Sequence, residues 1–136
     1  MPVTAPVSLA PNTTYHYRAL ASNGAGTSAG ADSTFTTPGP PAATTGGASG
    51  LTATAATLGG SVDPNGLATT YRAEWGPTTG YGWTSTWRSA GSATWGATVS
   101  VAVTGLASRQ LYHYRLVATN SSGTTYGSDR TLTTTR

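Results

Sequence analysis

Residues 106–134 read LASRQLYHYRLVATNSSGTTYGSDRTLTT, and residues 9–37 read LAPNTTYHYRALASNGAGTSAGADSTFTT. The two stretches align at an offset of 97 residues without a gap, and 15 of their 29 positions are identical. The offset has the size of one small β domain and exceeds the period of roughly 20–50 residues that is typical of solenoids. The sequence therefore predicts two related modules on one chain.

Only the second copy is preceded by enough residues to supply a full set of strands. We expect residues 1–37 to be a partial module, the carboxyl-terminal half with about three strands, and residues 51–136 to be a complete module. Between them, Pro38-Gly39-Pro40-Pro41 favours a stiff extended segment, because proline cannot donate a hydrogen bond within a sheet. Residues 38–50 are therefore interpreted as a Pro/Gly-rich linker.

Residues 51–136 have the pattern of an all-β domain. Thr, Val and Tyr recur at period two, and turn signals such as Asp63-Pro64-Asn65-Gly66 separate the runs. Strands are predicted at 51–56, 57–63, 69–75, 83–88, 97–104, 111–120 and 124–134. Seven short strands in roughly 90 residues indicate an immunoglobulin-like antiparallel β-sandwich.

The segment 112–120 (YHYRLVATN), with Leu106 before it and Gly123 after it, resembles strands E to G of a fibronectin type III domain. Residues 58–66 (LGGSVDPNG) and 71–76 (YRAEWG) resemble strands B and C of its bacterial variety. The resemblance covers residues 42–136 fully and residues 3–37 as a carboxyl-terminal half. It implies a sandwich that occurs in tandem arrays in secreted and surface proteins.

Alternation along the strands predicts the core. On strand 111–120, the residues expected to face inward are Tyr112, Tyr114, Leu116 and Ala118, and those expected to face outward are His113, Arg115, Val117 and Thr119. Trp75 is expected in the core. By the resemblance, Tyr112 is the tyrosine-corner residue, whose hydroxyl bonds to backbone near Leu106. The inward set of the first copy is Leu9, Tyr15, Tyr17, Ala19, Ala21 and Phe35.

Composition and charge argue against several functions. Charged residues make up 8% of the chain, against about 25% in ordinary domains, and the seven Arg are scattered singly, so no nucleic-acid footprint is expected. Without Cys there is no disulfide framework or thiolate metal site. No apolar run approaches the roughly 20 residues that span a bilayer, so membrane insertion is not expected.

No catalytic constellation is visible in the sequence. The only histidines, His16 and His113, occupy equivalent repeat positions on an outward face, and neither has a partner at metal-ligand spacing. The turn at Asp63 offers one carboxylate, which is a poor calcium site. We expect neither enzymatic activity nor a cofactor.

The segment 81–88 (YGWTSTWR), followed by Trp95, is unusually aromatic. On one continuous strand, Trp83 and Trp87 share a face roughly 13 Å apart. Three interpretations stay open: the rings cap the core, they contact another protein, or they stack on a glycan. The candidate interaction surface is Tyr81, Trp83, Trp87, Arg88 and Trp95.

The partial first module lacks the strands that cover its inward face. A fragment below about 40 residues rarely holds a core alone, so we expect a partner: other copies of this chain, docked head to tail through residues 1–37, or neighbouring modules. The candidate assembly face is Leu9, Tyr15, Tyr17, Ala19 and Phe35.

The predicted function is that of a non-catalytic, extracellular structural or interaction module of a bacterial surface protein, in a tandem array or a self-assembling fibre. Low charge and many Thr, Ser and Gly residues suit an extracellular location. No signal peptide is visible after Met1, so secretion requires a longer precursor. The alternative is a spacer or weak carbohydrate-binding accessory module of a secreted polysaccharide-degrading enzyme.

Overall fold

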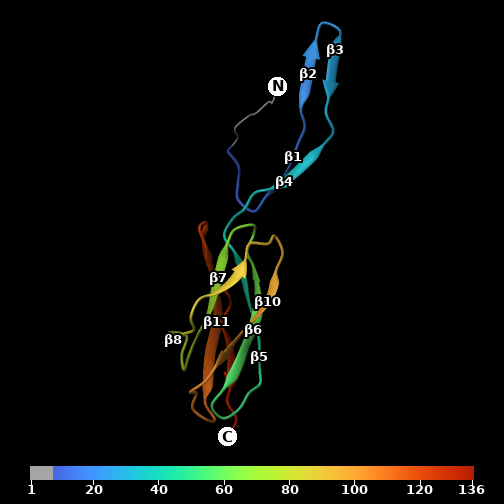
Figure 1. The fold of residues 1–136 in the computed structure, drawn as a ribbon. Coiled ribbons are helices and arrows are strands. Elements are labelled where there is room, and N and C mark those ends of the chain that lie inside the picture. Colours follow the sequence, from blue (N-terminus) through green and yellow to red (C-terminus); the bar gives the residue numbers. More distant parts are fainter. Residues whose placement is uncertain (1–7) are drawn as a thin grey trace. The chain divides into compact units, whose positions relative to one another are not determined.

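The computed structural model describes residues 8–136 as an all-β protein whose paired strands all run antiparallel (Figure 1). The chain divides into two compact units, Met1–Pro38 and Gly39–Arg136. We call the second unit the carboxyl-terminal module. The prediction that residues 1–7 belong to the partial module concerns residues outside the described range.

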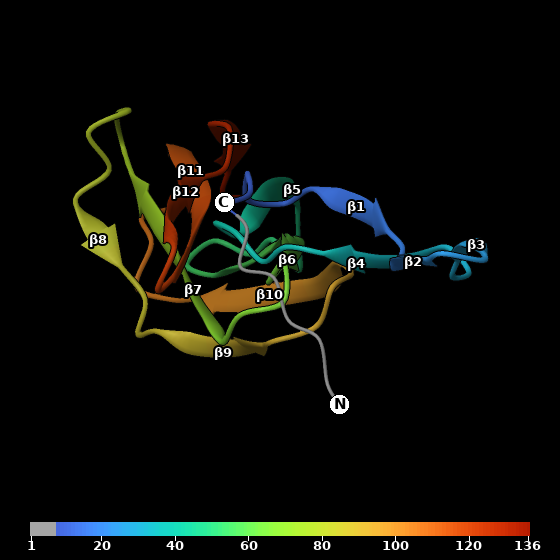
Figure 2. The same ribbon diagram turned by 90° about the horizontal axis from the view of Figure 1, so that it is seen from above.

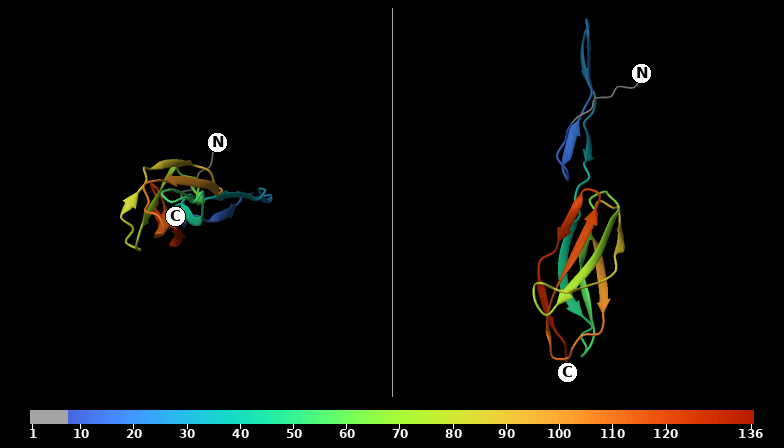
Figure 3. Two further views of the ribbon diagram at one scale, coloured as in Figure 1. Left: turned by 90° about the horizontal axis from the view of Figure 1, so that it is seen from below. Right: turned by 90° about the vertical axis from the view of Figure 1, so that its left-hand side faces the viewer.

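The carboxyl-terminal module is a two-sheet sandwich (Figures 2 and 3). One sheet has the order β10-β6-β5, made of β10 (Ala97–Val103), β6 (Ala56–Asp63) and β5 (Ala42–Ser49). In the other sheet the central strand β11 pairs with β7, β12 and β13, and the short strands β8 and β9 pair with β7. These strands are β7 (Thr69–Gly76), β8 (Trp83–Thr84), β9 (Arg88–Gly91), β11 (Leu111–Asn120), β12 (Gly123–Tyr126) and β13 (Arg130–Thr133).

The core lies between the two sheets and follows the predicted alternation. All four residues expected to face inward on β11 are buried, and Trp75 is partly buried against the same cluster. Val117 lies on the outward-facing side, as alternation predicts, but it is only 1% exposed. Its cross-strand neighbours are Arg72 and Tyr126, whose long side chains cover it. The outer face of this sheet therefore has a covering layer of its own.

The first strand of the module differs from the prediction. Residues 51–55 form no strand, and β5 lies at 42–49, inside the segment interpreted as linker. Thr45 is buried, and its hydroxyl accepts a hydrogen bond from the Leu116 N–H (3.2 Å). A Cβ on Gly46 would meet Gly60 at 3.0 Å, so small residues let β5 approach β6 closely. The strand carries few bulky β-formers, and the sequence pattern therefore missed it.

The amino-terminal unit contains one long hairpin, which we call the amino-terminal hairpin. Strand β1 (Thr14–Tyr17) pairs with β4 (Ser33–Thr36), and β2 (Leu20–Asn23) pairs with β3 (Gly26–Ala29). The strands of this hairpin pair in the same register as their equivalents in the carboxyl-terminal module, 97 residues later. Tyr15 lies opposite Phe35, and the equivalent Tyr112 lies opposite Leu132. Residues 8–13 form no strand, so the described part of this unit matches strands F and G only.

The amino-terminal hairpin and its equivalent in the module, which is formed by β11 with β12 and β13, also share a side-chain hydrogen bond. The Ala107 N–H donates to the Tyr112 hydroxyl (2.8 Å), which confirms the tyrosine corner, and the Ala10 N–H donates to Tyr15 in the same way (3.1 Å). They differ in what covers them. Tyr17 is 57% exposed, whereas its equivalent Tyr114 is 1% exposed.

This difference gives a matched test of the tyrosine corner. Tyr112→Phe leaves the partly buried Ala107 N–H without its acceptor and should lower the free energy of unfolding by about 1–3 kcal/mol. Tyr15→Phe removes the equivalent bond from an uncovered hairpin and should leave the module unchanged. Denaturant titration monitored by tryptophan fluorescence reports the unfolding of the carboxyl-terminal module alone, because all four Trp lie in residues 39–136. Equal losses in both variants would reject the assignment.

Candidate interaction surfaces

The outer face of the larger sheet carries a linked set of charged and aromatic side chains. We call it the arginine–aromatic strip and define it as Arg72, Glu74, Tyr81, Trp87, Arg115 and Tyr126. Glu74 lies opposite Arg115 in the β7–β11 pair. Its carboxylate accepts hydrogen bonds from Arg115 Nε (2.9 Å) and Arg72 Nη2 (3.3 Å). One carboxylate therefore orients both guanidinium groups.

Aromatic rings stack on both guanidinium groups. The Arg72 guanidinium carbon lies 4.5 Å from the Trp87 ring centre. The Arg115 guanidinium lies 4.4 Å from the Tyr126 ring and 4.7 Å from the Tyr81 ring. Such cation–π contacts hold the planar groups in place. Trp87 and Tyr126 remain 44% and 55% exposed, so the strip presents fixed flat rings to solvent.

Asp129 extends this surface at its tyrosine end. It accepts a hydrogen bond from the Tyr81 hydroxyl (2.9 Å) and is hydrogen-bonded to His113 Nδ1 (2.9 Å). Burial and the contact with Asp129 raise the pKa of Tyr81 from 10.0 to about 12. Burial acts to raise the pKa of Asp129, but hydrogen bonds from His113 and Tyr81 outweigh it, and the pKa lies below its ordinary value.

The structure does not bring the five candidate residues together. Tyr81 and Trp87 belong to the strip. Trp83 lies opposite Trp75 on the inward side, 6.5 Å from the Tyr112 ring, and lines a cavity of about 110 Å³. Arg88 lies opposite Tyr71, and Trp95 lies in the connection between β9 and β10. The expectation that Trp83 and Trp87 share a face is wrong.

An interruption of the strand explains this error. Residues 83–88 do not form one strand, because β8 ends at Thr84 and β9 begins at Arg88. Between them, the Ser85 hydroxyl accepts a hydrogen bond from Ala73 N, and the Ser85 N–H donates to Ala73 O, both at 2.9 Å. A serine side chain thus takes the place of a backbone carbonyl in the ladder. Alternation does not continue across such a break.

Sequence reasoning missed most of the strip. Arg115 was expected only as an outward residue, and the sequence pattern gave no role in the candidate site to Arg72, Glu74, Tyr126 or Asp129. The signal that could have found them is the pairing of strands C and F, which places the outward residues of 72–74 beside those of 113–117. A second signal was the repetition of the His113 and Asp129 pair as His16 and Asp32 in the first copy. These two residues are also hydrogen-bonded to each other (2.8 Å).

The candidate assembly face lies on the amino-terminal hairpin. Tyr15 stacks on Phe35 at a centroid distance of 5.8 Å, and Tyr17 packs against the edge of the same ring. Leu9, Tyr17 and Phe35 are exposed, and Ala19 is exposed with them. The structure therefore brings Tyr15, Tyr17 and Phe35 of the predicted set together, and it leaves Leu9 and Ala19 exposed.

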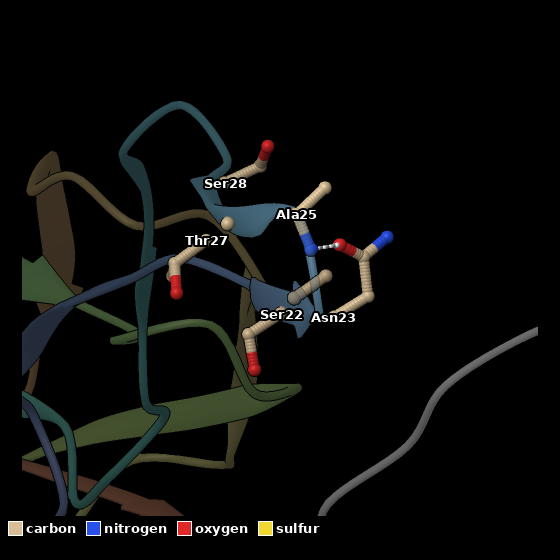
Figure 4. Close-up of a pocket in the computed structure, with 7 residues that line it drawn as sticks. Ser22, Asn23, Ala25, Thr27 and Ser28 are labelled. Carbon is tan, nitrogen blue, oxygen red and sulfur yellow. Dashed lines mark hydrogen bonds between the residues drawn. The ribbon is translucent and has the colours of Figure 1, made fainter.

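The hairpin ends in a polar tip at the turn between β2 and β3 (Figure 4). There the Asn23 side-chain oxygen accepts a hydrogen bond from the Ala25 N–H (2.8 Å). A shallow hollow of about 470 Å³ at the tip is lined by small residues, including Ser22, Thr27 and Ser28. All of these residues are exposed, so the hollow has no buried polar group that could select a ligand.

Two absences hold for residues 8–136. This range has no cluster of three or more His, Asp or Glu residues placed to hold a metal ion. The same range has no helix that could cross a membrane.

The chain matches no protein-family model and no curated protein. Among solved structures it is similar to the sensor domain of the anti-sigma factor RsgI4 from Pseudobacteroides cellulosolvens (TM-score 0.56, 18% identity, 71% of this chain and 95% of that chain). A solution structure of that sensor domain gives a TM-score of 0.51 at 17% identity, with 69% and 74% covered. The chicken CNTN1 FN1–FN3 domains give 0.50 at 14% identity, with 94% and 44% covered. The protein therefore has a fibronectin type III-like β-sandwich fold.

The contact between Tyr81 and Asp129 predicts that the Tyr81 hydroxyl loses its proton at a higher pH than an ordinary tyrosine. Because the pKa of Tyr81 is raised in the folded state, its contribution to stability is present below pH 10 and is lost as the pH rises through about 12. Phenolate absorbance should show a late component that Tyr81→Phe reduces by the amplitude of one tyrosine, because burial also raises the pKa of Tyr114. In Asp129→Asn the component should shift down but stay above 10, since burial remains the larger cause. A Tyr81→Phe curve whose late component keeps its full amplitude would contradict the assignment.

Proposed function

We propose that the chain is a non-catalytic structural and interaction module of an extracellular bacterial surface protein, of the type in which sandwich modules follow one another in tandem. The observation that carries this proposal is the repeated hairpin. Residues 14–36 and 111–133 form the same element in the same register. One copy belongs to a complete sandwich, and the other presents its inner face to solvent.

The chemistry of the module supports a structural role. Glu74 is bonded to two arginines, and Asp129 to a histidine and a tyrosine. These contacts order a surface, and they leave neither carboxylate as a free general base. The shared fold with a bacterial sensor domain and with CNTN1 supports an interaction role. The low charge and hydroxyl-rich composition support the extracellular location.

The proposed contact to other modules runs through residues 9–37. Neighbouring modules, or further copies of the chain arranged head to tail, would cover the exposed face formed by Tyr17 and Phe35. Contiguous exposed aromatic surface is characteristic of protein contact sites. Among residues 8–136, β1 and β2 each pair with one strand only, so their other edges offer backbone groups that favour pairing with another strand.

Deletion of residues 1–38 tests this role. We expect the full chain to self-associate weakly and reversibly as its concentration rises, because the hairpin exposes an apolar face. The remaining unit, 39–136, has its own core and should be a folded monomer at every concentration. Sedimentation velocity checks both. A deletion variant that associates as strongly as the full chain would contradict the proposal, and a full chain that stays monomeric would exclude further copies of itself as the partner.

A glycan-binding accessory module is the second candidate, and the strip favours it. Trp87 and Tyr126 are exposed rings held flat by arginines, which is the geometry that stacking on sugars requires. If this candidate holds, a soluble polysaccharide should retard the module in native electrophoresis. Trp87→Ala should abolish the retardation, and Trp95→Ala, outside the strip, should not. The absence of retardation with cellulose, xylan and chitin derivatives would leave the structural role preferred.

A further inference from the structure

We propose that the inner face of the amino-terminal hairpin is a docking site for four strands of the type of β5, β6, β7 and β10, supplied by a further copy of the repeat. The hairpin then closes a second sandwich. This inference deepens the tandem-repeat proposal and rests on it. It names which surface of the neighbouring module is bound and by which residues.

The carboxyl-terminal module shows how this face is covered. The Tyr114 hydroxyl donates to Gly46 O of β5 (2.7 Å), and β11 pairs with β7 along Thr70–Gly76. Leu116 and Ala118 pack in the core with residues of β6 and β10. In the amino-terminal hairpin, β1 pairs with β4 and β2 with β3. Among residues 8–136, no further strand pairs with either, so the edge equivalent to the β7 side of β11 is free.

A glycine retained at position 30 points to the same occupant. In the module a Cβ on the equivalent Gly127 would collide with the Thr45 side chain of β5. Gly127 is therefore small because a covering strand passes close to it. At Gly30 the nearest atoms belong to Ala19, at 3.4 Å or more, and the hairpin by itself would accept a larger residue. Gly30 thus preserves the space that a strand like β5 needs.

Asn23 preserves a second feature of a closed sandwich. Its equivalent Asn120 uses one side-chain oxygen to hold the turn, as Asn23 does (2.8 Å each). The Asn120 amide also donates to Gly39 O (2.9 Å) and Pro64 O (3.3 Å), which lie next to β5 and between β6 and β7. Asn23 therefore keeps the side chain that binds the segments flanking the covering strands.

A second copy of this chain is a weaker occupant than a free set of strands. In each copy, β5, β6, β7 and β10 already cover β11 and share its core. Binding a second hairpin there would displace the first, with no net gain of contacts. The favoured occupant is a further repeat whose four covering strands have no hairpin of their own.

The test extends the full chain with its own covering strands. A copy of residues 39–105 is joined directly before Leu9, in place of residues 1–8. This junction keeps the native spacing, because Leu9 is equivalent to Leu106. Hydrogen exchange of peptides from residues 14–36, read by mass spectrometry, should slow by about 100-fold or more relative to the unextended chain.

Three variants make the outcome decisive. Gly30→Ala should leave the unextended chain unchanged but remove most of the new protection in the extended one. Leu58→Asp in the added copy should abolish protection, because it breaks the covering core. Ala19→Leu restores the side chain present at Leu116 and should increase protection by filling the space left beneath it.

Protection of residues 14–36 in the extended chain, with or without Ala19→Leu, supports the inference. Unchanged exchange in both overturns it, and so does protection that survives Leu58→Asp in the added copy. The sedimentation experiment on the unextended chain tests the tandem-repeat role separately. Failure of docking and failure of the proposed function can therefore be distinguished.

Discussion

Covering the inner face of the β11 hairpin is the constraint on which this structure depends. A two-stranded ribbon satisfies the backbone groups along its own pair, but it buries little apolar surface and is marginal in water by itself. In the module, β5, β6, β7 and β10 bury Tyr114 and Leu116 and give the tyrosine hydroxyl its acceptor at Gly46. The amino-terminal hairpin has the same register and none of this cover. Apolar burial, rather than strand pairing, separates a module from a fragment.

The outer side of the same sheet is organised by charge. Glu74 fixes two arginines, and Arg72 and Tyr126 of the same strip lie opposite the buried Val117. The strip therefore stabilises the sheet and at the same time holds Trp87 and Tyr126 at the surface. The amino-terminal hairpin repeats Arg18 at the position of Arg115 but has Ala29 where the module has Tyr126. The outer face of the amino-terminal hairpin thus keeps the histidine–aspartate pair and the arginine of the module, but it lacks the tyrosine that stacks on that arginine.

The fold could be predicted because repeat spacing, alternation and turn residues agree along most of the chain. Tyr112, Tyr114 and Leu116 are buried as alternation predicts. Strand β5 was missed because its pairing depends on small residues, which carry no period-two signal. The aromatic segment was misplaced because Ser85 interrupts the ladder. The arginine–aromatic strip was missed because its residues come from four separate stretches of sequence. Only the pairing of strands in the sheet brings these stretches together. Alternation within one strand does not show contacts that depend on which strands are neighbours.

The central claim is that one structural element occurs twice, covered in one copy and uncovered in the other. Nitration of tyrosines in the native full chain, mapped by mass spectrometry at a dilution where the chain is monomeric, tests it most directly. The claim predicts rapid modification of Tyr17, which is 57% exposed, and none of Tyr114, which is 1% exposed and whose pKa burial raises. Equal reactivity of Tyr17 and Tyr114 would contradict it.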